Sequence, residues 1–386
     1  MDYINSAEII PDYQTTMFSQ YNLLTFFGKL KEAAINYCKF DMARTMAVKV
    51  ECPDESQGLK SLYCISAFGT HPFVGGKLGA ELDTGAIAPA SHHAENLVYV
   101  MGSHTGYDHQ TKSWGRIYRE KEGGSSAACC GKLAAVMEPY LKEYEYAKTN
   151  IKVFKKDGEV FLKIPHRFLG TQSFVEHSSV RLCLNSSLIK TKGDVQTEGI
   201  IMTESPHLVI FKIHPDLLCA LRAKNKDITD EPTPIGDDLT GDYFKFQWVS
   251  PDPVPDDITG RLHPLMHKIV SSLDYHPMVT VANVQTQIEF NRFVDAIHAI
   301  PDVETKGIFG VSGLTVDLYF EGRPYPYSNV YYPQYAFFKR DDQREGLIMG
   351  PSEINKLLAA YPLAMERVSI DRILECNDKG NKEIKF

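Results

Sequence analysis

The sequence lacks the features that mark membrane, secreted and nucleic-acid-binding proteins. No apolar run approaches the roughly 20 residues that a membrane span needs, and the first residues, MDYINSAEIIPDYQ, carry acids where a signal or transit peptide would carry bases. Basic residues are not in excess, because 41 Lys and Arg stand against 49 Asp and Glu, for a net charge of −8 and a pI near 5.9. We therefore expect a cytoplasmic protein, or an organellar one after processing, with no membrane span and no nucleic-acid partner.

The sequence also lacks the pattern of a disulfide framework. Its eight cysteines among 386 residues have no regular spacing, which is typical of a reducing compartment where thiols stay free to bind metal. Hydrophobic residues make up 43% and charged residues 23% of the chain, as in ordinary globular proteins. A length of 386 residues exceeds the usual size of one domain, so we expect two domains or one domain with a large extension.

Two predicted strands each end next to a residue that can bind metal. Residues Met46–Glu51 form an apolar run rich in β-branched side chains, and the run stops at Cys52 because Pro53 cannot continue a ladder. Residues Asn96–Met101 form a second such run, which ends at a Gly-Ser step just before His104. The sequence thus predicts a thiol and an imidazole at the ends of two strands.

A third segment brings two more thiols. Residues 123–126 (GGSS) predict a loop with a serine cap, and residues 127–135 (AACCGKLAA) predict the first turn of a helix that contains Cys129 and Cys130. A thiol in the first turn of a helix lies near the positive end of the helix dipole, which favours the thiolate that binds metal.

These three segments predict a zinc site at one edge of a sheet. In an open α/β sheet, residues that leave the carboxyl ends of strands or begin a helix converge at that edge. Two thiolates and one imidazole would leave one tetrahedral position for water, which is the arrangement of a catalytic zinc site. The separations along the chain fit no short zinc motif. The alternative is that the three cysteines are small buried core residues and that His104 is a hydrogen-bonded loop histidine.

Four short segments follow one another between Cys52 and Ala135: CPDE (52–55), PFVGGK (72–77) running on to SHH (91–93), GSHTGYD (102–108) and ACCG (128–131). In their order and separations they resemble the limiting-CO2-inducible B and C proteins of algal carbon-concentrating systems, a family with a fold similar to β-class carbonic anhydrases. The resemblance implies an α/β protein with a β-carbonic-anhydrase-like sheet flanked by helices, and a homodimer. It also implies CO2 and bicarbonate as the substrate and product.

The resemblance assigns roles to individual positions. The family's zinc ligands fall on Cys52, His104 and Cys130, with Cys129 as the alternative third ligand. Adjacent helical residues diverge by about 100 degrees, so both cysteines would rarely bind one ion. The family's aspartate falls on Asp54, which would accept a hydrogen bond from the zinc-bound water and orient it. Zinc lowers the pKa of its water from about 15.7 to near 7, which implies reversible hydration of CO2 to bicarbonate.

One position departs from the family pattern. Active members carry an arginine two residues after the aspartate, which keeps it ionised, whereas this sequence has Ser56. Either another cation, such as Lys77 or Arg116, takes that place, or Asp54 swings onto the metal and blocks the open position. The departure leaves an alternative function: a catalytically silent, zinc-stabilised scaffold or a bicarbonate-binding protein that acts through partners. Another metal-assisted hydrolysis is a further alternative.

Export of the proton needs a titratable shuttle, for which His92 and His93 are the candidates. The alternative for this pair is a loop in which the two side chains cap backbone groups. A second pair, His263 and His267, has the i, i+4 spacing of metal ligands, but no third ligand has an identifiable spacing. We therefore expect solvent or core roles for the second pair.

The organisation of the chain is predicted as an α/β protein with a C-terminal α+β extension. We expect a zinc domain over residues 1–222, an acidic, proline-rich linker or excursion over 223–256, and an α+β region of unknown role over 257–386. The aromatic, proline-rich stretch 325–335 predicts a packed loop, with a binding surface as the alternative. The hydrophobic pattern predicts helices at 22–40, 286–300 and 351–359, a strand at 207–213, a hairpin at 151–164 that adds edge strands to the sheet, and a strand pair at 307–320 around a Ser-Gly step.

Overall fold

The computed structural model describes residues 21–108, 110–119, 123–169, 179–185, 200–205, 207–213, 218–219, 221, 227–272, 276–300, 303–319, 327–343 and 345–363. The chain divides into two compact units. Unit 1 combines the chain up to Cys130 with the chain from Gln285 onward, and unit 2 is Gly131–Val284. In sequence, unit 2 is therefore an insertion into unit 1.

Unit 1 is built on a mixed sheet that has nine strands among the described residues. The sheet strands are β1 (Tyr21–Asn22), β2 (Thr45–Val50), β3 (Phe73–Val74), β4 (Asn96–Met101), β5 (His104–Asp108), β6 (Ser113–Trp114), β16 (Gly307–Tyr319), β17 (Tyr327–Lys339) and β18 (Leu347–Met349), and β7 (Arg116–Arg119) and β8 (Ser125–Ala128) form a separate hairpin. The main path of the sheet runs β1-β17-β16-β4-β2-β3, while β18 pairs with β17 and β5 pairs with β16 and β6.

The central strands meet with their carboxyl ends at one edge of the sheet. β2 and β4 are buried on both faces, which explains their nearly unbroken apolar sequences. They pair in parallel up to Val50 opposite Met101, so the residues that follow them leave the sheet side by side. β16 pairs in parallel first with β4 and then with β5. The long strand β16 therefore holds β4 and β5 one after the other along its length.

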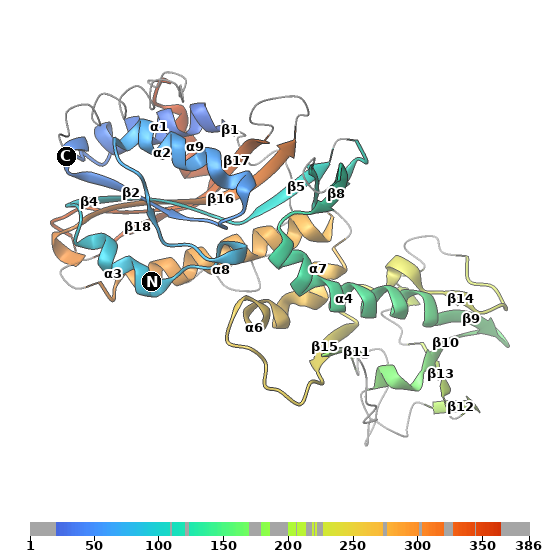
Figure 1. Ribbon diagram of the computed structural model, residues 1–386. Coiled ribbons are helices and arrows are strands. Elements are labelled where there is room, and N and C mark those ends of the chain that lie inside the picture. The colour runs from blue at the N-terminus through green and yellow to red at the C-terminus, as the bar shows by residue number, and fades with distance from the viewer. Residues whose placement is uncertain are drawn as a thin grey trace. The chain divides into compact units, whose positions relative to one another are not determined.

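Helices cover both faces of this sheet (Figure 1). The unit 1 helices are α1 (Leu23–Asn36), α2 (Gly58–Phe68), α3 (Thr84–Ser91) and α9 (Pro351–Ala359). The part of α8 (Pro277–Ile297) from Gln285 onward also belongs to unit 1. α1, α2 and α9 share a core with Val98 and Val100 of β4. α3 and α8 pack on the opposite face against Tyr99, whose ring lies 4.7 Å from that of Phe293. Alternate residues of β4 thus feed two cores, as the pleat of a strand requires.

Unit 2 contains two antiparallel sheets among its described residues: β12-β13-β10-β9-β14 and β11-β15. Its elements are α4 (Gly131–Asn150), β9 (Lys152–Lys156), β10 (Glu159–Pro165), β11 (Val180–Leu184), β12 (Ile200–Ser205), β13 (Leu208–Lys212), β14 (Thr233–Pro234), β15 (Phe244–Trp248), α6 (Ile258–Leu262) and α7 (Met266–Val270). The Nδ1 atom of the half-buried His263 lies 2.8 Å from the hydroxyl of Tyr140.

The predicted α/β class is confirmed, and so are most of the local elements. The helices at 22–40 and 351–359 form as α1 and α9, the strand at 207–213 forms as β13, and the two strands that end near Cys52 and His104 form as β2 and β4. The helix expected at 286–300 begins earlier, at Pro277. In the described ranges, no helix combines the length and the apolarity needed to cross a bilayer.

Other predictions fail where long-range pairing decides the structure. The strand pair expected at 307–320 is a single strand, β16, because Gly313 produces only a register shift against β17. The described part of the stretch 325–335 is not the predicted packed loop: from Tyr327 it forms β17, and its first two residues lie outside the described residues. The hairpin at 151–164 forms as β9 and β10 but belongs to the sheet of unit 2.

The observed units differ from the predicted domains. The boundaries predicted after residues 222 and 256 both fall inside unit 2. Residues 223–226 lie outside the described residues, and the rest of the predicted linker carries β14 and β15. The predicted C-terminal region is split, because β16 pairs with β4 and so joins the first sheet. Pairing between two strands that lie this far apart in the chain leaves no local signal in the sequence.

Candidate metal centre

The candidate site lies at the carboxyl edge of the central strands of unit 1. Cys52 follows the end of β2 by two residues, and His104 begins β5 after a short turn from β4. Because β2 and β4 are parallel and end opposite each other, the structure brings this thiol and this imidazole to the same edge.

The turn between β4 and β5 depends on Gly102. Its φ is +136°, and a Cβ atom there would lie 1.7 Å from the carbonyl oxygen of Gly313 in β16, so no other residue fits. The N–H of Gly102 donates to the carbonyl oxygen of Val50 at 3.2 Å. The turn lets the chain leave β4 and pair with β16 again as β5, which sets His104 opposite Thr315.

The other thiols come from the hairpin β7–β8 and not from inside a helix. Ser125–Ala128, expected to form a serine cap and the start of a helix, form β8, and α4 begins only at Gly131. Cys130 directly precedes that helix, so the prediction of thiols within its first turn is wrong. The reason is that pairing of β8 with β7 overrides the weak local preference for helix. The N–H of Cys129 donates to the carbonyl oxygen of Gly115 at 2.9 Å.

Three ligand atoms, one each from Cys52, His104 and Cys130, lie within 4.8 Å of one another. The two Sγ atoms are 3.8 Å apart. Two Zn–S bonds of about 2.3 Å at the tetrahedral angle would place their sulfurs about 3.8 Å apart, whereas a disulfide bond is about 2.05 Å long. The two thiols are therefore spaced to share a metal ion. All three residues are at most 2% exposed.

His104 is oriented as metal-binding histidines usually are. Its Nδ1 donates to Oδ2 of Asp317 at 2.6 Å, and its buried Nε2 has no hydrogen-bond partner in the described part of the chain. A metal-binding histidine typically donates its second ring N–H to a carboxylate, and a buried nitrogen without a partner is costly. Two thiols and this Nε2 are also the donor set of tetrahedral zinc sites. The residues present therefore fit a metal ion.

Asp317, on β16, is the buried carboxylate that holds His104. Its Oδ2 accepts a hydrogen bond from the hydroxyl of Ser56 at 2.8 Å, and its Oδ1 accepts from Nε2 of Gln57 at 2.7 Å and from Nδ2 of Asn329 at 2.6 Å. Burial raises the pKa of Asp317, but the charge and the hydrogen bond of His104, together with the hydrogen bond from Ser56, outweigh burial and lower the pKa overall. An ionised Asp317 keeps the proton of His104 on Nδ1 and leaves Nε2 for a metal.

A second group of ligand atoms, from His104, Cys129 and Asp317, is equally compact. The thiol of Cys129 donates to Asp317 at 3.3 Å and lies 3.7 Å from Nδ1 of His104. Nδ1 is already engaged by Asp317, however, and the oxygens of Asp317 are occupied by the hydrogen bonds described above. The geometry therefore favours Cys130 over Cys129 as the third ligand.

The two thiols of the pair have opposite pKa shifts. The thiol of Cys130 donates to Cys52, and this hydrogen bond, with the nearby His104, lowers the pKa of Cys52 to about 4 despite its burial. The same hydrogen bond and burial raise the pKa of Cys130. Burial lowers the pKa of His104, but Asp317 more than offsets it, and the pKa of His104 is well above its usual value. In the metal-free cluster, these shifts favour a thiolate at Cys52 and protonated forms of Cys130 and His104.

Metal binding at pH 7 is expected to release about two protons per ion. The ion replaces the proton of Cys130 and the Nε2 proton of His104, and the pKa values of both groups are raised in the metal-free protein. Affinity should therefore increase with pH between about pH 6 and 8, by about a hundredfold per unit. Titration calorimetry in buffers of different ionisation enthalpy measures the protons released. An affinity that does not change with pH would contradict this assignment.

Asp54 lies beside the cluster. It caps the short 3-10 turn Glu55–Gln57, and its Oδ1 accepts the backbone N–H of Ser56 at 3.0 Å. Its charge contributes to the pKa of Cys129, which burial and Asp317 raise to about 12. The side chain of Ser56 faces Asp317, so the residue at the position of the missing arginine is part of the support of His104.

The two cations suggested as substitutes for that arginine lie elsewhere. Lys77 pairs with Asp83 at 3.4 Å, and Arg116 donates to Ser126 across the hairpin β7–β8. A cation does reach Asp54, since Nη2 of Arg119 lies 3.3 Å from its Oδ2.

His92 and His93 are exposed residues at the end of α3. They precede β4, and the N–H of Glu95 donates to the carbonyl oxygen of Arg44 just before β2 begins. The pair therefore lies near the amino ends of the strands, while the cluster lies at their carboxyl ends. A strand of six residues separates these edges by roughly 17 to 20 Å. Within one chain, this placement does not support the predicted proton shuttle.

Sequence reasoning missed Asp317, Asn329 and Arg119. Asp317 lies 213 residues from His104 along the chain. The available signal was that Asp317 is the one charged residue of β16, because a charge in an almost fully buried strand requires a partner. Arg119 carried no comparable signal, because Arg116 is on the same short strand and nothing local distinguishes the two.

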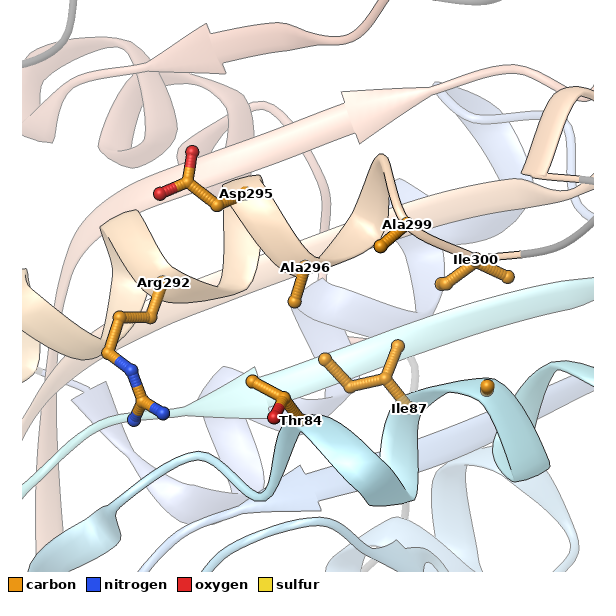
Figure 2. A pocket seen from close by; sticks show the side chains of 8 residues that line it. Thr84, Ile87, Arg292, Asp295, Ala296, Ala299 and Ile300 are labelled. Carbon is orange, nitrogen blue, oxygen red and sulfur yellow. The ribbon is translucent and has the colours of Figure 1, made fainter. Parts of the chain in front are cut away.

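A groove of about 450 Å³ also lies in unit 1, between α3 and α8. Figure 2 shows its aliphatic lining, with Ile87 facing Ala296, and Arg292 at one end. Arg292 donates to Glu289 at 2.6 Å, so its charge is already balanced. The residues of the metal cluster do not line this groove.

Comparison with known proteins gives structural matches only. No protein-family model and no curated protein matches the chain. A point mutant of PtLCIB4, a homolog of the limiting CO2-inducible protein LCIB, matches with a TM-score of 0.49 and 11% identity over 89% of this chain and 97% of that chain. PtLCIB4 itself matches with a TM-score of 0.45 and 12% identity over 87% and 97%. LCIB matches with a TM-score of 0.40 and 12% identity over 86% and 95%. The three solved structures are thus described as limiting CO2-inducible proteins or their homologs.

Proposed function

We propose that the protein is a member of the limiting-CO2-inducible family and catalyses the reversible hydration of CO2 to bicarbonate at a zinc ion. The observation that carries the proposal is the arrangement of Cys52, His104 and Cys130, whose two sulfurs are 3.8 Å apart and whose imidazole presents a buried nitrogen without a hydrogen-bond partner in the described chain. Three protein ligands leave a fourth tetrahedral position, as in catalytic zinc sites. The sequence resemblance supplies the substrate.

The side chains around the cluster have separate roles in this proposal. A zinc ion supplies Lewis-acid activation of water, lowering its pKa from about 15.7 to near 7. Cys52 and Cys130 hold the ion, and Asp317 orients His104 toward it. Asp54, fixed by the backbone N–H of Ser56, accepts a hydrogen bond from the reacting water and orients it. The homodimer implied by the resemblance is part of the proposal and is tested by sedimentation analysis.

A second function is favoured by the burial of the ligands. Cys52, His104 and Cys130 are at most 2% exposed, and the histidines expected to export protons lie near the other edge of the sheet. Both observations suit a zinc-stabilised scaffold or a bicarbonate-binding protein that acts through partners. Both functions need the same three zinc ligands, but only the enzyme would turn over CO2.

Stopped-flow measurement of CO2 hydration on metal-quantified protein separates the two functions. We expect zinc-loaded protein to accelerate hydration, and Asp54→Ala to lower kcat by about 10² to 10⁴ with zinc retained. The matched control is Asp252→Ala, which removes an exposed carboxylate from unit 2 and should not change the rate. A rate at the uncatalysed level with one zinc ion per chain would exclude the enzymatic function and leave the scaffold.

A further inference from the structure

Both oxygens of Asp54 are engaged, although the residue lies only two positions after a metal ligand. Its Oδ1 accepts the N–H of Ser56 at 3.0 Å, and its Oδ2 lies 3.3 Å from Nη2 of Arg119. The two side chains of the ion pair are only 13% and 9% exposed, so water screens their attraction weakly. A carboxylate is itself a good zinc ligand, and these contacts decide whether Asp54 acts as one.

Arg119 comes from the hairpin that also carries the third ligand. It ends β7 opposite Ser125 of β8, and the chain then runs from β8 directly to Cys129 and Cys130. The hairpin is fixed to β5, because the N–H of Gly106 donates to the carbonyl oxygen of Cys129 at 3.0 Å. The same hairpin therefore carries the guanidinium group and leads directly to the third ligand.

The guanidinium of Arg119 is held by a second acid. Its Nη1 pairs with Glu55, and the hydroxyl of Tyr327 donates to the same carboxylate at 3.2 Å. Arg119 thus spans two consecutive acidic side chains with two different nitrogens. An arginine can do this because its guanidinium is a planar fork with a permanent charge. Glu55, on the 3-10 turn, holds the guanidinium in place and is itself held by Tyr327 of β17.

We propose that Arg119 is a positioning residue that holds Asp54 off the metal ion and so keeps the fourth coordination position open to exchangeable ligands. This proposal rests on the metal centre of the proposed function. When Arg119 is present, Asp54 is a fixed hydrogen-bond acceptor beside that position. When it is absent, one oxygen of Asp54 loses its partner and the carboxylate becomes a fourth ligand. Arg119 thereby takes the place of the arginine that the sequence lacks at Ser56.

Azide binding to the cobalt-loaded protein tests this role without relying on turnover. Cobalt(II) accepts the ligands of zinc sites, and its visible spectrum changes when a ligand is exchanged. We expect Arg119→Met to bind azide about 10- to 100-fold more weakly than the wild type, and Arg119→Lys, which keeps the charge, to lose less. The double variant Arg119→Met/Asp54→Ala should recover the wild-type azide affinity, since the blocking carboxylate is gone. Arg116→Met, on the same strand, is the matched control and should bind azide like the wild type.

Two results would overturn the proposal: equal azide affinities for Arg119→Met and the wild type, or a double variant that binds azide as weakly as Arg119→Met. Cobalt content and thermal unfolding are measured for every variant. If Arg119→Met does not fold, Arg119→Gln, which keeps hydrogen-bonding groups without the charge, is titrated in its place with the same expected loss. Failure of the proposed function looks different: a wild type that binds azide in the expected pattern but does not hydrate CO2 supports the role of Arg119 and excludes catalysis.

Discussion

Cys52→Ser and Cys130→Ser are expected to yield protein without bound metal. Each variant removes one of the two sulfurs that lie 3.8 Å apart, and a neutral serine hydroxyl is a far weaker ligand than a thiolate. Because the three ligands come together only in the folded chain, the wild type should be more stable than either variant by about 4 kcal/mol when the free ion is at 1,000 times its Kd. Metal analysis of the purified proteins and denaturant unfolding with and without a chelator measure both effects.

Two other cysteines provide the controls for this experiment. Cys38→Ala removes a buried thiol from the core between the sheet and α1, and it should keep one ion per chain. Cys129→Ser tests the alternative third ligand, and it should also keep the ion, because the Cys129 thiol lies by Nδ1 of His104 and by Asp317. Loss of metal from Cys129→Ser, with metal retained in Cys130→Ser, would reverse the assignment of the third ligand.

Lys60→Met is expected to destabilise the protein by about 3 to 5 kcal/mol, because it leaves an unpaired carboxylate in the core. Lys60, on α2, pairs with Glu51, and the two side chains are 1% and 0% exposed. The Nζ of Lys60 also donates to Oγ1 of Thr315 at 2.5 Å and lies 5.2 Å from the centre of the Tyr331 ring. Glu51 is the residue before Cys52, so this ion pair anchors the end of β2 next to the metal cluster. Denaturant unfolding measures the change in the free energy of unfolding.

A double variant separates the loss of the pair from the burial of a lone charge. Lys60→Met/Glu51→Gln removes both charges and should be more stable than Lys60→Met alone. The exposed pair of Arg44 and Glu95, with side chains 60% and 53% exposed, provides the control, and Arg44→Met should cost less than about 1 kcal/mol. A cost for Lys60→Met as small as that of the control would mean that the buried pair contributes little.

Local sequence patterns predicted the strands that carry the site. β2 and β4 are apolar runs that stop at Pro53 and at Gly102, and each stop is a local steric fact: proline has no N–H for a ladder, and only glycine adopts the φ that the turn requires. The same patterns predicted α1 and α9 through their hydrophobic spacing. They did not predict β8, because a four-residue strand beside a helix start has no distinctive period.

The partners of the site residues could not be predicted in this way. Asp317 supports His104 from a strand that follows the whole of unit 2 in the sequence, and Asn329 and Ser56 reach the same carboxylate from two further elements. Ser56 is an example. In the sequence it stands where the resembled family has an arginine. In the structure its buried hydroxyl donates to Asp317, and Asp54 is paired with Arg119 from another element.

The sequence by itself determined which residues can bind a metal and that two of them follow the ends of strands, because strand ends and ligand chemistry are properties of short segments. Only the tertiary structure decided that Cys130 lies by Cys52 while Cys129 lies by Asp317, and that Arg119 is the cation beside Asp54. The physical reason is that these contacts depend on how β5, β16 and the hairpin β7–β8 pair. Such pairing joins residues by backbone hydrogen bonds, which any sequence can form, and so it leaves little trace in the residues themselves.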